Sequence, residues 1–125
     1  MKKPGKNGIQ ILVVDDEATV CKAIKMLLEF DGHKVETSVD AESALAILED
    51  KTFDLIITDY SMTGMKGDRM AAHIKKKHPQ QPIIMVTAFA DDFRIAGKPT
   101  VEVDAVVSKP FSLKELREAI VQVMA

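Results

Sequence analysis

Residues 9–17 read IQILVVDDE, an apolar run that ends in three consecutive acids. The stretch 11–14 has no helical period, which is typical of a central strand buried on both faces. Asp15 and Asp16 then set two like charges side by side at the end of that strand, which costs folding free energy unless something compensates. Mg²⁺ is a natural compensator, because it prefers one or two carboxylates together with water and phosphate oxygens. The alternative is a solvated acidic turn that caps the following helix.

Composition indicates a globular domain. The chain has 125 residues, of which 46% are hydrophobic and 29% charged, and its net charge of -2 gives no sign of a nucleic-acid or membrane-surface partner. The single cysteine, Cys21, excludes an internal disulfide framework and fits a cytoplasmic location. No apolar run is long enough to span a membrane. We expect residues 1–8 to form a flexible leader and residues 9–125 to form one domain.

Strands and helices alternate along the rest of the chain. Helical spacing predicts helices over 18–30, from Asp40 to about residue 48, over 68–77, and from Ser112, which opens a capping box with Glu115. Strands are predicted over 11–14, 34–38, 53–58, 83–86 and 105–107. The alternation favours an α/β fold, a doubly wound parallel sheet with helices on both faces.

Polar residues follow four of these strands. They are Asp15 with Asp16, Asp59, Thr87 and Lys109. Each has an ordinary explanation as a turn, a cap or a surface residue. In open parallel sheets, however, ligands bind beyond the carboxyl ends of the strands, where all five residues are expected to meet.

These groups suit phosphoryl chemistry. A third carboxylate beside a magnesium-binding pair can ligate the ion or attack phosphorus as a nucleophile. The ion would bind one phosphoryl oxygen, the Lys109 ammonium a second, and the Thr87 hydroxyl together with backbone amides a third. The pattern therefore predicts a pocket for a tetrahedral dianion attached to Asp59.

The motifs carry a family resemblance. The pair Asp15-Asp16, the segment FDLIITDYSM with Asp59, the VTA segment with Thr87 and the Ser-Lys-Pro-Phe segment with Lys109 resemble the response-regulator receiver domain of two-component signalling, the CheY-like superfamily. The resemblance covers residues 9–125. It implies a flavodoxin-like fold of five parallel strands in the order 2-1-3-4-5, flanked by five helices.

The resemblance also implies roles. Asp59 would accept phosphate from the phosphohistidine of a sensor histidine kinase or a histidine phosphotransfer protein, in a two-component system or phosphorelay. Asp16, Asp59 and the backbone carbonyl of Ser61 would ligate Mg²⁺, for which Mn²⁺ can substitute, and Asp15 would act largely through bound water. Thr87 would move towards the phosphoryl group, and the Lys109-Pro110 peptide would be cis. The domain would promote its own phosphorylation and dephosphorylation as a signalling module, without direct nucleic-acid binding; its output partner is not indicated.

The chain departs from the family pattern in the loops. Thr63 stands where a proline is frequent, and Lys66 stands where an acidic or amide residue is frequent; both changes are expected to affect loop stiffness and kinase contacts. Val106 replaces the usual switch aromatic. Gly97 and Pro99 predict a truncated or irregular fourth helix, ending by about residue 96.

Two positions are expected to tune how long the phosphate lasts. Ser61 and Phe89 lie two residues after Asp59 and Thr87, along the line on which water would attack. The bulky, apolar Phe89 is expected to hinder that water, although simple packing on the loop explains it equally well.

Other functions with a similar fold fit less well. A flavin carrier needs a Ser/Thr/Gly-rich phosphate cradle after the first strand, where this chain has the acidic pair Asp15-Asp16, which would repel that phosphate. A haloacid-dehalogenase-type phosphatase needs a second Asp two residues after its nucleophile, where this chain has Ser61, and a nucleotide hydrolase needs a glycine-rich Lys-Ser/Thr loop. The remaining alternative is a degenerate receiver that binds partners without phosphorylation.

Overall fold

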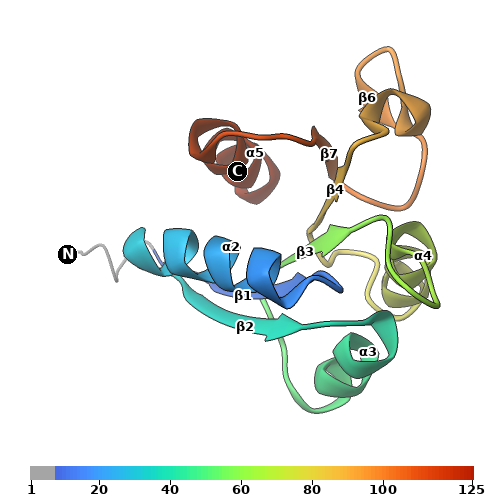
Figure 1. Cartoon of the computed structure of the whole chain (residues 1–125). Helices are drawn as coiled ribbons and strands as arrows, with labels where there is room; N and C mark the ends of the chain where they lie inside the picture. The colour runs from blue at the N-terminus through green and yellow to red at the C-terminus, as the bar shows by residue number, and fades with distance from the viewer. Residues whose placement is uncertain (1–7) are drawn as a thin grey trace.

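The computed structural model describes residues 8–125, so the predicted leader lies outside the described residues except for Gly8. Five parallel strands form one sheet in the order β2-β1-β3-β4-β7, namely β1 (Gln10–Val14), β2 (Lys34–Ser38), β3 (Leu55–Asp59), β4 (Ile83–Thr87) and β7 (Ala105–Ser108). The helices in this range are α2 (Ala18–Phe30), α3 (Ala41–Asp50), α4 (Gly67–Lys77) and α5 (Leu113–Met124). Figure 1 shows the alternating arrangement, which confirms the predicted fold. None of these helices is both long and apolar enough to cross a membrane.

The sheet has a topological switch point beside β1. The first strand pairs with β2 on one side and with β3 on the other, in both cases in parallel register. The chain therefore places β2 on one side of β1 and then adds β3, β4 and β7 in turn on the other side. In such sheets the carboxyl ends of the two strands at the switch point face a crevice that binds ligands.

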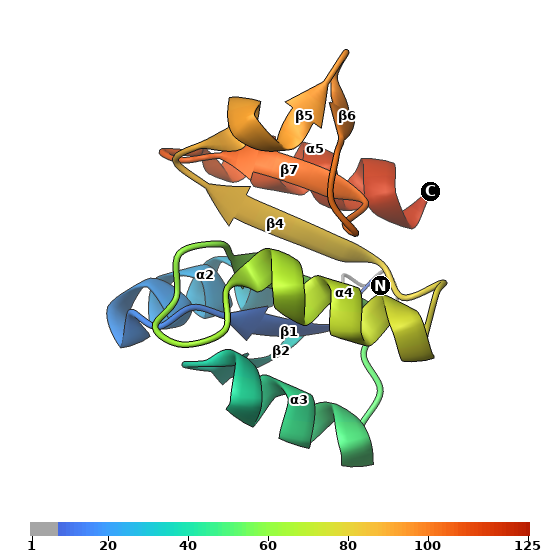
Figure 2. The same ribbon diagram turned by 90° about the vertical axis from the view of Figure 1, so that its right-hand side faces the viewer.

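Two helices cover each face of the sheet. Figure 2 shows α3 and α4 in front of the sheet, with α2 and α5 behind it. Alternate residues of each central strand supply the two cores: Ile11 and Val13 pack with α2 and α5, whereas Leu12 and Val14 pack with α3 and α4. Burial on both faces accounts for the unbroken apolar runs in the central strands.

The helix expected after β4 is replaced by other structure. One 3-10 turn, η1 (Ala90–Phe93), leads into a short antiparallel hairpin of β5 (Arg94–Ile95) and β6 (Lys98–Pro99). The two turn residues, Ala96 and Gly97, both have positive φ, of 53° and 77°, as tight hairpins require. The predicted irregularity is confirmed, but the helical part is shorter than expected and ends at Phe93.

Helix ends follow local chemistry. The Asp40 side chain accepts a hydrogen bond from the Ser43 backbone amide at the start of α3. Ser112 and Glu115 form the predicted capping box at the start of α5. Each bond satisfies a backbone N–H at a helix start that has no partner within the helix.

Candidate functional site

Three carboxylates meet at the carboxyl ends of β1 and β3. One oxygen from each of Asp15, Asp16 and Asp59 lies within 4.8 Å of the others. Asp15 and Asp59 are buried, with exposed fractions of 2% and 6%, whereas Asp16 is exposed. The sheet topology causes this convergence, because β1 and β3 are neighbouring parallel strands that end at the same edge. The structure thus brings the three predicted acids together.

Lys109 reaches into this cluster from the end of β7. Its Nζ lies 3.0 Å from Asp59 Oδ1 and 3.6 Å from Asp15 Oδ2. Its backbone amide donates a 2.9 Å hydrogen bond to the Thr87 carbonyl, which fixes the segment beside β4. The following Lys109-Pro110 peptide is cis, as predicted.

Burial and charge shift the pKa of two of these groups. Burial, more than any other cause, raises the pKa of Asp15, and the Asp59 charge adds to this, while a hydrogen bond from the Glu17 amide and the Lys109 charge oppose it. For Lys109, burial lowers the pKa, but the hydrogen bond to Asp59 and the charges of Asp59 and Asp15 raise it overall. The ammonium therefore stays charged at neutral pH and partly compensates the buried acids.

Thr87 is buried at the end of β4, with an exposed fraction of 1%. Its Oγ1 accepts a 3.0 Å hydrogen bond from the Phe89 amide. This bond uses a lone pair of the hydroxyl and leaves its proton free to be donated elsewhere. Phe89 itself is 55% exposed, and Ser61 lies on the exposed part of the loop after Asp59.

The loop between β3 and α4 is held closely against the acceptor strand. The Gly67 amide donates to the Tyr60 carbonyl, and a Cβ at Gly67 would collide with the Asp59 carbonyl oxygen. The Met62 side chain is buried, and the Lys66 ammonium donates to the Met62 carbonyl at 2.9 Å. Lys66, which departs from the family pattern, thus closes the loop.

One contact of the site was not predicted from the sequence. Asp16 Oδ2 accepts two hydrogen bonds from Thr63, from its backbone amide at 3.1 Å and from its hydroxyl at 3.2 Å. Thr63 was expected to affect loop stiffness and kinase contacts more than the chemistry of the site. The available signal was a hydroxyl and an N–H where a proline, which has neither, is frequent.

The site fits a hard divalent cation. Among the described residues, 8–125, three carboxylates share the cluster with one ammonium, so negative charge remains in excess where two of the acids are buried. Oxygen donors of this kind are those that Mg²⁺ and Mn²⁺ prefer. A cation there would also offset the repulsion between the acids.

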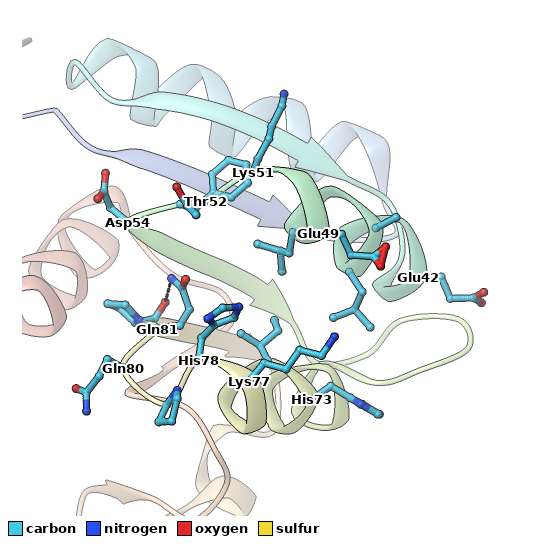
Figure 3. A pocket seen from close by; sticks show the side chains of 17 residues that line it. Glu42, Glu49, Lys51, Thr52, Asp54, His73, Lys77, His78, Gln80 and Gln81 are labelled. Carbon is cyan, nitrogen blue, oxygen red and sulfur yellow. Dashed lines mark hydrogen bonds between the residues drawn. The ribbon is translucent and has the colours of Figure 1, made fainter.

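A groove lies at the opposite end of the sheet. It has a volume of about 1140 Å³ and lies between α3 and α4, against the segments that precede β3 and β4. Figure 3 shows His78 and Gln81 in it, with Gln81 donating to the Pro82 carbonyl. Because it adjoins the amino ends of the strands, the groove is separate from the acidic cluster.

Comparisons with known proteins agree with this geometry. A family model described as the response regulator receiver domain matches residues 11–121. Over 117 residues the chain is 31% identical to the probable transcriptional regulatory protein TcrX of Mycobacterium tuberculosis, covering 93% of this chain and 50% of TcrX. Over 112 residues it is 36% identical to the phosphate regulon transcriptional regulatory protein PhoB of Pseudomonas aeruginosa, covering 87% of this chain and 48% of PhoB. The chain thus spans about half the length of these two relatives.

Solved structures are similar in both fold and sequence. The response regulator TrrA of Thermotoga maritima, in complex with Mg²⁺-BeF, has a TM-score of 0.82 and 32% identity, covering 91% of this chain and 97% of the other. A CheY-like receiver domain protein of Methanospirillum hungatei has a TM-score of 0.83 and 30% identity, covering 94% of each chain. The chain belongs to the family of response regulator receiver domains, the signalling domains of two-component systems.

Proposed function

We propose that this domain is a magnesium-dependent phosphoacceptor, in which Asp59 takes a phosphoryl group from a phosphohistidine and thereby changes the domain's interactions with its partners. The observation that carries the proposal is the cluster of Asp15, Asp16 and Asp59 with Lys109 bonded to the buried Asp59. An acid held by one ammonium, beside two further acids suited to a cation, has the parts that phosphoryl transfer to a carboxylate needs.

In this transfer an Asp59 carboxylate oxygen attacks phosphorus and the phosphorus–nitrogen bond breaks. The electron pair of that bond returns to the donor imidazole, which is protonated on its other ring nitrogen and so leaves as a neutral ring. The Lys109 ammonium, 3.0 Å from Asp59 Oδ1, is placed to stabilise charge on a phosphoryl oxygen. The Thr87 hydroxyl, whose proton is free, would donate a hydrogen bond to a second phosphoryl oxygen once its side chain turns towards the phosphoryl group.

The proposed cation ligands are Asp16, Asp59 and the backbone carbonyl of Ser61, with Asp15 acting through bound water. When bound, Mg²⁺ supplies positive charge that neutralises the acids and one phosphoryl oxygen. Mn²⁺ should substitute, because it takes the same oxygen ligands. The similar structure of TrrA is in complex with Mg²⁺-BeF, which supports a magnesium site in this domain.

The proposed phosphate donors are a sensor histidine kinase or a histidine phosphotransfer protein. Support comes from membership of the receiver family and from the sensor histidine kinase AruS of Pseudomonas aeruginosa. Over 121 residues AruS is 31% identical to this chain, covering 94% of this chain and 12% of AruS. We propose that residues 9–125 form the receiver unit.

Incubation with acetyl phosphate and Mg²⁺, followed by intact-mass measurement, tests the proposal. The wild type should gain the mass of about one phosphoryl group, and Asp59→Asn should gain none. Asp54→Asn is a matched control, because Asp54 is an exposed acid just before β3 and its loss should leave the gain unchanged. An unmodified wild type would overturn the proposal and favour a degenerate receiver. Equal modification of Asp59→Asn would overturn it by showing that the phosphoryl group attaches to another residue.

A further inference from the structure

Asp16 occupies an unfavourable position in the cluster. It shares the cluster with the carboxylates of Asp15 and Asp59, whereas the ion pairs that the Lys109 ammonium forms within residues 8–125 are with those two acids. Because Asp16 is exposed, its side chain could turn outward, gain hydration and leave the repulsion of its neighbours. Something must therefore hold it in the cluster.

Thr63 supplies that restraint. Within residues 8–125, both hydrogen bonds found to the Asp16 carboxylate come from Thr63, and both reach Oδ2. Thr63 lies on the loop after Asp59 and is 47 residues away from Asp16 in sequence. This loop is itself fixed by the buried Met62 and by the Lys66 bond to the Met62 carbonyl. The Thr63 amide and hydroxyl therefore belong to a segment that is held in place independently of Asp16.

We propose that Thr63 is a positioning residue for the metal site: its hydroxyl and amide hold the Asp16 carboxylate in the orientation that receives the divalent cation. This inference rests on the proposed function, because it takes Asp16 to be a cation ligand.

The geometry gives the sign of the effect. Thr63 occupies Oδ2, so Oδ1 remains available to a cation, since a carboxylate oxygen pair accepts several bonds. Hydrogen bonds to ligating carboxylates fix their orientation, and losing such a bond typically weakens metal affinity about 10- to 100-fold. Replacing Thr63 by valine keeps the shape and β-branching but removes the hydroxyl, and the backbone amide remains. We therefore expect Thr63→Val to weaken Mg²⁺ affinity by about tenfold, the lower end of that range.

The test is a Mg²⁺ titration of the unphosphorylated protein, followed through backbone amide NMR shifts at residues 16, 61 and 63. Thr63→Val should raise the Kd for Mg²⁺ about tenfold, and Thr63→Ser, which retains a hydroxyl, should restore it. In an Asp16→Ala background, Thr63→Val should have no further effect on the Kd, because the group that it orients is gone. Thr52→Val, at an exposed position remote from the site, is the control for a generic Thr-to-Val effect.

Each outcome decides the matter. A Kd for Thr63→Val that matches the wild type or falls below it would overturn the proposal, the latter by showing that Thr63 competes with the cation. So would an equal loss in Thr63→Ser, or a loss that persists undiminished in the Asp16→Ala background. A thermal melt without Mg²⁺ should be the same for all the Thr63 variants; a lower melting temperature for Thr63→Val would assign its effect to folding. A wild type that shows no Mg²⁺-dependent shift would refute the metal site itself, a failure distinct from that of Thr63.

Discussion

Replacing Lys109 with methionine tests the electrostatic basis of the site. The substitution keeps a long side chain but removes the ammonium that lies 3.0 Å from Asp59 Oδ1 and 3.6 Å from Asp15 Oδ2. Both acids are buried, so neither can recover full hydration when the positive charge is lost. Without a cation, the folded variant then holds three acids close together and has lost the ammonium that contacts two of them.

The structure sets the size of the effect. At an effective dielectric of about 20, each of the two contacts is worth about 5 kcal/mol of gross attraction. The desolvation of partly buried charges offsets much of this, and breaking a buried pair by removing one partner typically costs about 3–5 kcal/mol. Because the Lys109 side chain is 27% exposed, we expect the lower end, a loss of about 3 kcal/mol of unfolding free energy at neutral pH. For a domain of this size that lowers the melting temperature by roughly 10 °C.

Urea unfolding at neutral pH without divalent ions measures this loss. Lys22→Met is the matched control, because Lys22 is exposed on α2 and its removal should change little. Saturating Mg²⁺ should restore part of the stability of Lys109→Met, since binding to the folded state alone stabilises it. Lower pH should also narrow the deficit, because Asp15, whose pKa burial raises, takes up a proton in the folded state.

A Lys109→Met protein as stable as the wild type at neutral pH without Mg²⁺ would refute the reasoning. That result would mean that the acids are compensated without the ammonium. A deficit that neither Mg²⁺ nor acid reduces would assign the loss to packing and not to charge.

Four other substitutions test separate parts of the structure. Asp15→Asn should stabilise the cation-free protein at neutral pH, because the raised pKa of Asp15 means that its ionisation costs folding free energy. This cost builds up as the pH rises from the ordinary pKa of 3.8 through the raised one. The stability advantage of the variant in urea unfolding should therefore grow over that pH range and then level off. Gly67→Ala should cost about 1–3 kcal/mol of unfolding free energy and slow phosphorylation from acetyl phosphate, because the added Cβ displaces the Asp59 backbone. Ser112→Ala removes the side-chain acceptor of the α5 capping box and should cost about 1 kcal/mol in the same unfolding assay, with phosphorylation unchanged. Phe89→Asn should shorten the phosphoryl lifetime measured by intact mass, by removing the bulk expected to hinder water; an unchanged lifetime would assign Phe89 to loop packing.

Much of the fold could be predicted because burial leaves a local signature. Central strands covered on both faces need unbroken apolar runs, as in residues 11–14, and helices covered on one face need apolar residues at helical spacing, as in α5. Capping is equally local, and the Ser112–Glu115 box was predicted for that reason. Once parallel strands were inferred, Asp15, Asp16 and Asp59 had to meet at one edge, because parallel strands align their carboxyl ends.

Other features depend on contacts between segments far apart in sequence. Gly97 and Pro99 predicted a disrupted helix, but not the hairpin that pairs Arg94 with Pro99. Likewise, the Asp104 carboxylate accepts hydrogen bonds from both Lys75 and the Ile83 amide, joining α4 to β4. Neither arrangement is encoded in a local pattern of burial.

The hydrogen bonds from Thr63 to Asp16 are the clearest example of a feature that only the tertiary structure decides. Hydrophobic periodicity records which side of a segment is buried, and it identifies the strands that carry the acids. It holds no information on which polar side chains from two separate loops come within hydrogen-bonding distance. That depends on how the loop after β3 is held by the buried Met62, by the Lys66 bond to the Met62 carbonyl and by the Gly67 bond to the Tyr60 carbonyl. Only the folded chain brings this loop beside Asp16.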